Sequence, residues 1–309
     1  MLSHKATRTG RLAGVRRWWL SWLIGGGLMS GCVPGPDVWT AEGVDLWTGA
    51  HRTVDGWYRF TEGPTRDPKG GVYFSDLVSK KIYRWDPSGA VKTLREGEAT
   101  NGLYVSSDGT LYGCEPYARR VVRIDAKGAS HSVAERYQGH RFNSCNDLWV
   151  DPKGGIYFTD PLYSKDRAKD QDGEHVYYVP ASGQVRQVTK DLVRPNGIIG
   201  TPDGSHVFVV DDGVGKTYRY RVEASGDLAE KTLFTAHGAD GLALDAQGRL
   251  YMVGETVMVF NEAGSKVADF DFPFRPTNVA FGGKDRRLLF VTGKWVVHIL
   301  TMKVRGAGP

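Results

Sequence analysis

The sequence predicts an all-β protein folded as a six-bladed β-propeller with four-stranded blades. Three observations indicate this fold. One hairpin pattern occurs six times, its copies begin 38 to 50 residues apart, and no long stretch has the 3.6-residue apolar periodicity of a helix. The 40 glycines also favour short strands joined by tight turns. A repeat of this length with several short strands per unit is typical of a propeller blade.

The clearest copy of the hairpin is NDLWVDPKGGIYFTD, residues 146–160. Its apolar runs, 148–150 and 156–158, flank an Asp-Pro-Lys-Gly-Gly turn, which is the pattern of two antiparallel strands. The two polar ends of such a hairpin should lie on the same side of the sheet. The other copies begin at Glu62, Asn101, Asn196 and Asp240, with a degenerate copy at Asn278.

The first 31 residues are typical of an export signal. They contain five basic residues and no acid, followed by the apolar run WWLSWLIGGGLM, which is too short to span a bilayer comfortably. The segment Leu28-Met29-Ser30-Gly31-Cys32 resembles the processing box of bacterial lipoproteins, in which the cysteine is lipidated and becomes the new N-terminus. The alternatives are an ordinary secretory signal cut nearby and a short membrane anchor.

We therefore predict a lipoprotein-type signal at 1–31, a proline-stiffened tether at 32–38 and one propeller domain at 39–309. The mature protein would be a periplasmic or outer-membrane lipoprotein of a bacterium, held to the membrane only by the lipid on Cys32. The chain has a formal net charge of +5, and the first 31 residues account for it, so the remaining body is neutral. A neutral body gives no reason to expect a nucleic-acid partner. We expect a monomer.

A ring of blades must close on itself, and closure protects its edge strands. Residues 39–60, which include Trp47, Val54 and Trp57, are therefore expected to supply a strand to the last blade. Segments such as 80–96 alternate apolar and polar residues about a glycine turn, as expected for outer strands. The polar segment 164–174 is expected to be a surface loop.

The residues that open the hairpins should point at one another near the axis and form a polar collar; they are Glu62, Asn101, Asn146, Asn196, Asp240 and Asn278. Turn preference explains one or two Asn or Asp residues, but it explains neither an unbroken ring of six nor Glu62. All six side chains offer an oxygen, and two are carboxylates. The collar therefore predicts one divalent cation, with Ca²⁺ the best match and Mn²⁺, Mg²⁺ or Zn²⁺ as alternatives.

Several motifs in order resemble the SMP-30/gluconolactonase/LRE family of six-bladed propellers, over nearly the whole mature chain. They are FTEGP at 60–64, FNS at 142–144 with ND at 146–147, YFTDP at 157–161, RPNG at 194–197, DGL at 240–242, PTNVAFGG at 276–283 and KVRG at 303–306. The resemblance implies a lactone hydrolase whose metal is bound by Glu62, Asn196 and Asp240. Asn146 matches a family position that completes the metal shell or positions the substrate, and Asp240 matches the acid/base carboxylate.

Elementary chemistry makes these assignments plausible. Opening a lactone requires a polarised carbonyl and a delivered water, which a metal ion with open positions can supply. Asp240 beside the cation could accept the proton of the water, and Asn146 could donate to the developing oxyanion. We further predict that Asn101, Asp160 and Tyr163 bind substrate.

One departure from the family concerns residues 114–117, which read Cys-Glu-Pro-Tyr where bacterial members commonly have Cys-Glu-His-Gly. The proline removes a polar group and puts gluconolactone itself in doubt, so other lactones and phosphotriesters are alternative substrates. A different class of function is a non-enzymatic propeller scaffold stabilised by calcium. Serine-hydrolase and zinc-peptidase motifs are absent from the sequence.

Two cysteines lie beside the collar in neighbouring blades. Cys114 and Cys145 could form a disulfide in an oxidising compartment, and two buried thiols are the alternative.

Overall fold

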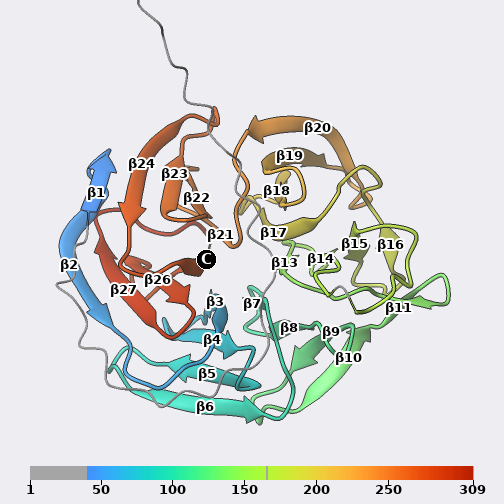
Figure 1. Cartoon of the computed structure of the whole chain (residues 1–309), viewed down its shortest axis with the longest axis horizontal. Helices are drawn as coiled ribbons and strands as arrows, with labels where there is room; N and C mark the ends of the chain where they lie inside the picture. Colours follow the sequence, from blue (N-terminus) through green and yellow to red (C-terminus); the bar gives the residue numbers. More distant parts are fainter. Residues whose placement is uncertain (1–39, 165, 309) are drawn as a thin grey trace, which may run out of the picture. The chain divides into compact units, whose positions relative to one another are not determined.

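Six small antiparallel sheets form a ring in the computed structural model of the chain (Figure 1). The structure describes residues 40–164 and 166–308, which belong to one compact unit, Val38–Pro309. This arrangement confirms the predicted six-bladed propeller. The predicted signal and tether, with Cys32, lie outside the described residues and stay predictions. No helix long and apolar enough to cross a membrane occurs in the described part of the chain.

The first three blades follow one another along the chain, with strand order equal to sequence order within each blade. Blade 1 comprises β3 (Thr61–Arg66), β4 (Val72–Asp76), β5 (Lys81–Trp85) and β6 (Val91–Glu96). Blade 2 comprises β7 (Leu103–Val105), β8 (Leu111–Glu115), β9 (Arg120–Ile124) and β10 (Ser130–Ala134). After the small ribbon of β11 (Arg136–Tyr137) and β12 (His140–Arg141), blade 3 comprises β13 (Leu148–Val150), β14 (Ile156–Asp160), β15 (His175–Val179) and β16 (Arg186–Gln187).

The last three blades complete the ring. Blade 4 comprises β17 (Pro195–Gly200), β18 (His206–Asp211), β19 (Lys216–Val222) and β20 (Leu228–Thr235). Blade 5 comprises β21 (Leu242–Leu244), β22 (Leu250–Val253), β23 (Val257–Phe260) and β24 (Lys266–Asp271). Blade 6 comprises β25 (Pro276–Gly282), β26 (Leu288–Gly293) and β27 (Val297–Met302), and it takes its fourth strand from the start of the chain.

That fourth strand is β2 (Trp47–Thr53), which pairs with β27 and confirms the predicted closure. A further strand, β1 (Thr40–Gly43), pairs with β24 and makes blade 5 five-stranded, which the sequence did not predict. The described residues therefore contain every strand of the closed ring. A chain that begins at residue 33 keeps all of these strands.

The recurrent turn between the first two strands of a blade explains the Asp-Pro-Lys-Gly-Gly pattern. In blade 3, Oδ1 of Asp151 accepts hydrogen bonds from the amides of Lys153 (2.7 Å) and Gly155 (2.9 Å), which is an Asx turn. Gly154 has a φ of 82°, a left-handed conformation that favours glycine. Asp67 in blade 1 and Asp245 in blade 5 accept the corresponding pair of backbone hydrogen bonds and fix the same turn.

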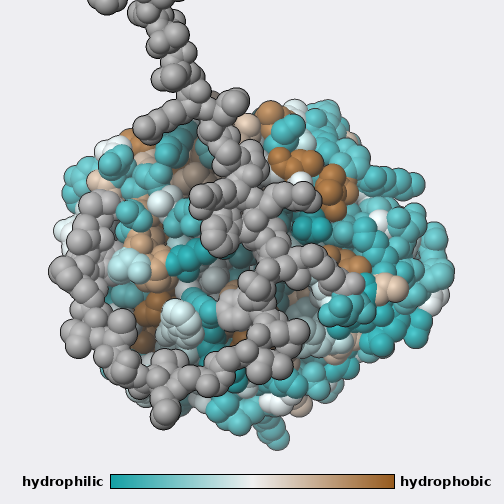
Figure 2. Space-filling model, viewed as in Figure 1, coloured by the Kyte–Doolittle hydropathy of each residue, from teal (hydrophilic) through white to brown (hydrophobic). Residues whose placement is uncertain are grey.

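Hydrophobic clusters hold the blades against one another. Trp85 of blade 1, for example, packs against Phe290 of blade 6 with ring centres 5.0 Å apart, and Tyr251 of blade 5 lies 5.1 Å from Phe281 of blade 6. Much of the described surface seen in Figure 2 is hydrophilic. The rigidity of this apolar packing fixes the positions of the first strands around the axis.

In each blade the first strand begins at the face where the second strand ends. Thr61 pairs with Asp76 in blade 1, and Pro195 pairs with Asp211 in blade 4. We call this side of the ring the mouth face. It carries the loops that precede each first strand and those that join second to third strands.

Candidate functional site

The six hairpin-opening residues lie together at the mouth face, as predicted. Glu62, Asn196 and Asn278 lie near the start of β3, β17 and β25, and the other three directly precede β7, β13 and β21. Four of the six are buried, and Asn146 and Asp240 are half-buried. We call these six residues the collar.

Hydrogen bonds join collar residues from neighbouring blades. Asn278 donates from its amide to Oε2 of Glu62 (3.0 Å), and Asn101 donates to the backbone carbonyl of Asn146 (3.2 Å). The side chains of Asn196 and Asp240 are also hydrogen-bonded. The collar is therefore a connected structure whose side chains are oriented by their neighbours.

Glycine follows four of the six collar residues, and the structure shows why. A Cβ on Gly197 would lie 2.0 Å from the carbonyl oxygen of Asp240, and one on Gly241 would lie 1.9 Å from Oδ1 of Asn278. Gly102 is restricted in the same way, because its Cβ would lie 2.4 Å from Oδ1 of Asp147. The collar can close only because these positions have no side chain.

Asp147 is a functional candidate that the sequence reasoning missed. Its Oδ1 accepts from the amide of Leu148 (2.9 Å), and its Oδ2 accepts from the amide of Ile198 (3.3 Å) in the next blade. Burial raises the pKa of Asp147 to about 7, and Asp240 contributes to the same shift. The signal for it was present: Asp147 occupies the position after a collar residue where four other blades have glycine.

Glu62 and Asp240 form the electrostatic centre of the collar. Burial, and next the charge of Asp240, raise the pKa of Glu62 well above its ordinary value. Burial likewise raises the pKa of Asp240, although a hydrogen bond from Asn196 opposes the shift. Two carboxylates that repel each other in a poorly solvated site are unfavourable unless a proton or a cation neutralises them.

The predicted substrate residue Tyr163 lies close to this centre. Burial raises its pKa well above the ordinary value, and the next contributions are the charges of Asp212 and Asp240. The guanidinium of Arg194 lies 5.4 Å from the ring centre of Tyr163. Tyr163 is therefore placed where it can contact a ligand bound at the collar.

Asp212 is the second residue that sequence reasoning missed. It follows β18 on the mouth face, and its charge contributes to the raised pKa values of both Asp240 and Tyr163. Its Oδ2 is buried and has no hydrogen-bond partner among residues 40–164 and 166–308. No sequence pattern marks this residue, because its position depends on the conformation of the loop after β18.

The carboxylate of Asp160 is engaged by the backbone, and its predicted role in substrate binding stays a prediction. It is fully buried, its Oδ2 accepts from the amide of Asn143 (2.7 Å) and its Oδ1 accepts from the amide of Ser144 (2.7 Å). Asp76 and Asp211 occupy the equivalent position, the end of the second strand, in blades 1 and 4. Each accepts two backbone hydrogen bonds from the loop that precedes the first strand of its blade. The residue is a structural element of the repeat.

Asn101 lies within the collar, but its side-chain amide is bonded to the carbonyl of Asn146 and is directed along the ring.

Cys114 and Cys145 are two free thiols in one hydrophobic cluster. The structure therefore contains two buried thiols, which was the alternative to the predicted disulfide. Burial raises the pKa of both thiols well above the ordinary value. Neither cysteine is placed to act as a nucleophile.

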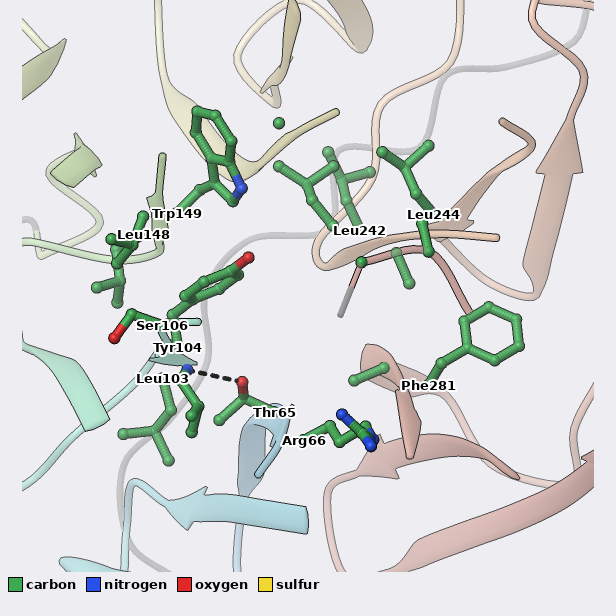
Figure 3. A pocket seen from close by; sticks show the side chains of 18 of the residues that line it. Thr65, Arg66, Leu103, Tyr104, Ser106, Leu148, Trp149, Leu242, Leu244 and Phe281 are labelled. Carbon is green, nitrogen blue, oxygen red and sulfur yellow. Dashed lines mark hydrogen bonds between the residues drawn. The ribbon is translucent and has the colours of Figure 1, made fainter. Parts of the chain in front are cut away.

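A central cavity of about 430 Å³ reaches the collar from the opposite face of the ring. Asp147 and Asn278 lie at its collar end, and Arg66 and Ser106 belong to its lining near the far end. Figure 3 shows Tyr104, Trp149, Leu242 and Phe281 around it. The collar therefore lies between this cavity and the mouth face.

The collar residues are suited to a divalent cation. In the described part of the chain, neither Glu62 nor Asp240 forms a salt bridge with a Lys, Arg or His side chain. The charge of Arg275 lowers the pKa of Asp240, but the guanidinium is paired with Glu255 and the pKa stays raised. No group of three or more His, Cys, Asp or Glu side chains within those residues is placed to hold a metal. A cation here would therefore use the oxygens of two carboxylates together with Asn amides, a donor set that hard cations accept.

The fold and the acidic collar define a six-bladed propeller with a candidate cation site on its axis. The profile of the SMP-30/Gluconolactonase/LRE-like region matches residues 60–294, and the chain belongs to that family.

Similar proteins include a gluconolactonase of Zymomonas mobilis, 26% identical over 79% of this chain and 79% of its own length. The pentonolactonase XacC of Haloferax volcanii is 28% identical over 78% of this chain and 84% of its own length. Among solved structures, a gluconolactonase of Xanthomonas campestris superposes with a TM-score of 0.77 at 27% identity and covers 87% of this chain and 98% of the other.

Proposed function

We propose that the chain is a divalent-metal-dependent hydrolase that opens sugar lactones at the collar. The observation that carries the proposal is the pair Glu62 and Asp240: the charge of Asp240 raises the pKa of Glu62, and neither carboxylate forms a salt bridge within the described residues. Family membership and the lactonases among the similar proteins support the reaction class.

Glu62, Asn196 and Asp240 would bind the cation, with Asn146 as a fourth ligand. Such an ion supplies Lewis-acid polarisation of the lactone carbonyl and lowers the pKa of water. Oxygen donors alone favour Ca²⁺, and Mn²⁺, Mg²⁺ and Zn²⁺ are alternatives. The side chain of Asn146 has no hydrogen-bond partner within the described residues, which leaves its amide available for the ion or the substrate.

Asp240 acts as the general base in this proposal. In the absence of a cation, burial keeps its pKa raised, so the carboxyl holds a proton more readily than an exposed aspartate. A neighbouring cation would favour the ionised form, which can accept a proton from the attacking water. The hydrogen bond with Asn196 and the backbone bond from the Asp240 amide to Val253 (2.6 Å) fix its orientation.

Sugar lactones suit the polar side chains on the mouth face. The unpartnered Oδ2 of Asp212 can accept a hydrogen bond from a substrate hydroxyl, and Tyr163 lies near the same centre. Removing a hydroxyl would leave that buried carboxylate oxygen without a partner, which disfavours a deoxygenated analogue. Phosphotriesters and simple lactones remain alternative substrates that lack these hydroxyls.

A substrate panel tests the proposal. The protein should hydrolyse glucono-δ-lactone and pentonolactones with a higher kcat/KM than γ-butyrolactone or paraoxon, measured by proton release at constant pH. Asp212→Asn should reduce this preference for sugar lactones over γ-butyrolactone, because the substrate hydroxyl loses its carboxylate acceptor. No turnover of any lactone in the presence of Ca²⁺ or Mn²⁺ would exclude the proposed function and favour a scaffold.

We also propose export as a lipoprotein, supported by the basic start, the short apolar run and Cys32. Intact-mass measurement of the membrane fraction should show an acylated N-terminus at Cys32, and Cys32→Ser should abolish the adduct. An unmodified N-terminus elsewhere would contradict this.

A further inference from the structure

Exposed apolar side chains are concentrated on one face of the ring. Within the described residues, eight large hydrophobic side chains are exposed, and only Val44 and Leu233 lie away from the mouth-face loops. The other six lie in loops of the mouth face: Trp57, Val78, Tyr117, Val193, Val214 and Trp295. Such an uneven distribution indicates a surface that contacts something other than water.

Both tryptophans and one of the valines belong to three adjoining segments, residues 54–60, 77–80 and 294–296. The Thr61 hydroxyl bonds to the carbonyls of Gly293 (2.7 Å) and Val296 (3.0 Å), which joins the first segment to the third. Oxygens of Asp76 accept from the backbone amides of residues 59, 60 and 79, which joins the first segment to the second. We call Trp57, Val78 and Trp295 the tryptophan patch.

The three segments carry more basic than acidic residues. They contain the basic residues Arg59, Lys80 and Lys294 and one acid, Asp55. The ammonium of Lys294 lies 4.5 Å from the ring centre of Trp295. Trp57 is 98% exposed and Trp295 is 63% exposed, so neither indole is needed to complete the core. Exposed tryptophans beside basic side chains are typical of surfaces that bind the headgroup region of anionic bilayers.

The first described strand begins on the mouth face, on the side of the ring that carries the tryptophan patch. Thr40, the first residue of β1, pairs with Asp271 at the end of β24, and the last strand of a blade ends at the mouth face. Blade 5, which β1 joins, is next to blade 6, which carries Trp295, and blade 6 is next to blade 1. Figure 1 shows β1 and β2 across the ring from β15 and β16.

The distance from a lipid on Cys32 to this point is limited. Seven residues, 33–39, separate Cys32 from β1, and they can span at most about 25 Å when fully extended. A lipid anchor at Cys32 would therefore hold the blade 5 edge of the mouth face close to the bilayer.

We propose that the tryptophan patch docks into the headgroup region of an anionic phospholipid bilayer. The indoles of Trp57 and Trp295 enter the interface, and Arg59, Lys80 and Lys294 pair with lipid phosphates. The ring then sits tilted, with blades 5, 6 and 1 against the membrane and blade 3, with its charged loop, in water. The collar remains open along the raised side, so docking does not close the active site.

Vesicle binding tests the proposal on residues 33–309, without the lipid anchor. The protein should co-sediment with vesicles of phosphatidylethanolamine and phosphatidylglycerol, and less with vesicles of phosphatidylcholine alone. Trp57→Ala/Trp295→Ala should lower the partition coefficient by about tenfold or more, because both indoles leave the interface. Val44→Ala/Leu233→Ala removes the two exposed apolar side chains away from the mouth face and should bind as the parent does.

Three results would overturn the proposal: no binding of the parent to the anionic vesicles, equal binding of the tryptophan variant, or equal loss in the Val44/Leu233 control. Sedimentation velocity without lipid tests a second copy of the chain as the occupant. A parent dimer that the tryptophan variant cannot form would assign the patch to self-association instead. Because both indoles are exposed, the variant should keep the melting temperature of the parent, which separates lost docking from lost folding.

Discussion

Replacing Asp240 by Asn should abolish activity without destabilising the fold. The change keeps the shape of the side chain and removes one of the two buried collar charges, the proposed base and a cation ligand. We expect kcat/KM to fall at least 10²-fold, which corresponds to about 2.7 kcal/mol of transition-state stabilisation.

In the metal-free protein, Asp240→Asn should raise the free energy of unfolding at high pH, although it lowers activity. Glu62 and Asp240 have raised pKa values, so their contribution to stability is full below the ordinary pKa of a carboxyl and is lost as pH rises through the raised values. In the parent, ionisation of Glu62 is opposed by the charge of Asp240, and in the variant that charge is gone. For each unit by which the charge of Asp240 raises the pKa of Glu62, the variant should gain about 1.4 kcal/mol in its free energy of unfolding.

Chemical denaturation in a chelator, followed at pH 5 and pH 8, measures this difference. The free energy of unfolding of Asp240→Asn should equal or exceed that of the parent at pH 8, and the difference should shrink at pH 5. Asp285→Asn is the control, because Asp285 is exposed on the opposite face and should change neither activity nor pH dependence. An Asp240→Asn protein that is as fast as the parent, or clearly less stable at pH 8, would refute the reasoning.

Further predictions concern the remaining collar and the repeat. Glu62→Gln should weaken metal affinity more than the maximal rate, so that high Ca²⁺ or Mn²⁺ partly restores activity in a metal titration; unrestored loss would assign Glu62 another role. Gly241→Ala should misplace Asn278 and lower both metal affinity and the melting temperature, whereas an unchanged protein would show that the collar is less tightly packed. Asp160→Asn should cost roughly 1–3 kcal/mol in denaturation, because an amide cannot accept both backbone N–H groups, and it should leave KM for lactones unchanged. Thiol titration should detect Cys114 and Cys145 only after the protein is unfolded. If the unreduced, unfolded protein shows no free thiol at these positions, the predicted disulfide is correct.

The fold could be predicted because each blade is a local repeat. The hairpin turns are specified by Asp and Gly at fixed offsets, and the six copies specify six blades. Closure by β2 followed from the need to protect edges. The extra strand β1 was not predictable, because a four-residue edge strand reading TAEG has no apolar pattern.

The collar was predicted from the same repeat, but the roles of individual carboxylates were not. Asp160 was assigned to substrate, although the hairpins of blades 1 and 4 also end in Asp, which indicates a structural role. Asp147 was overlooked because it follows a collar residue, and only the structure shows it bonding across to Ile198. Asp212 depends on a loop conformation that no periodicity encodes.

Lactone hydrolysis by residues 33–309, measured before and after chelation and again after metal is returned, tests the central claim most directly. The account predicts that a sugar lactone is opened by the untreated protein, that chelation removes this activity while the fold remains, and that Ca²⁺ or Mn²⁺ restores it. Undiminished turnover after complete removal of divalent metal would contradict the account.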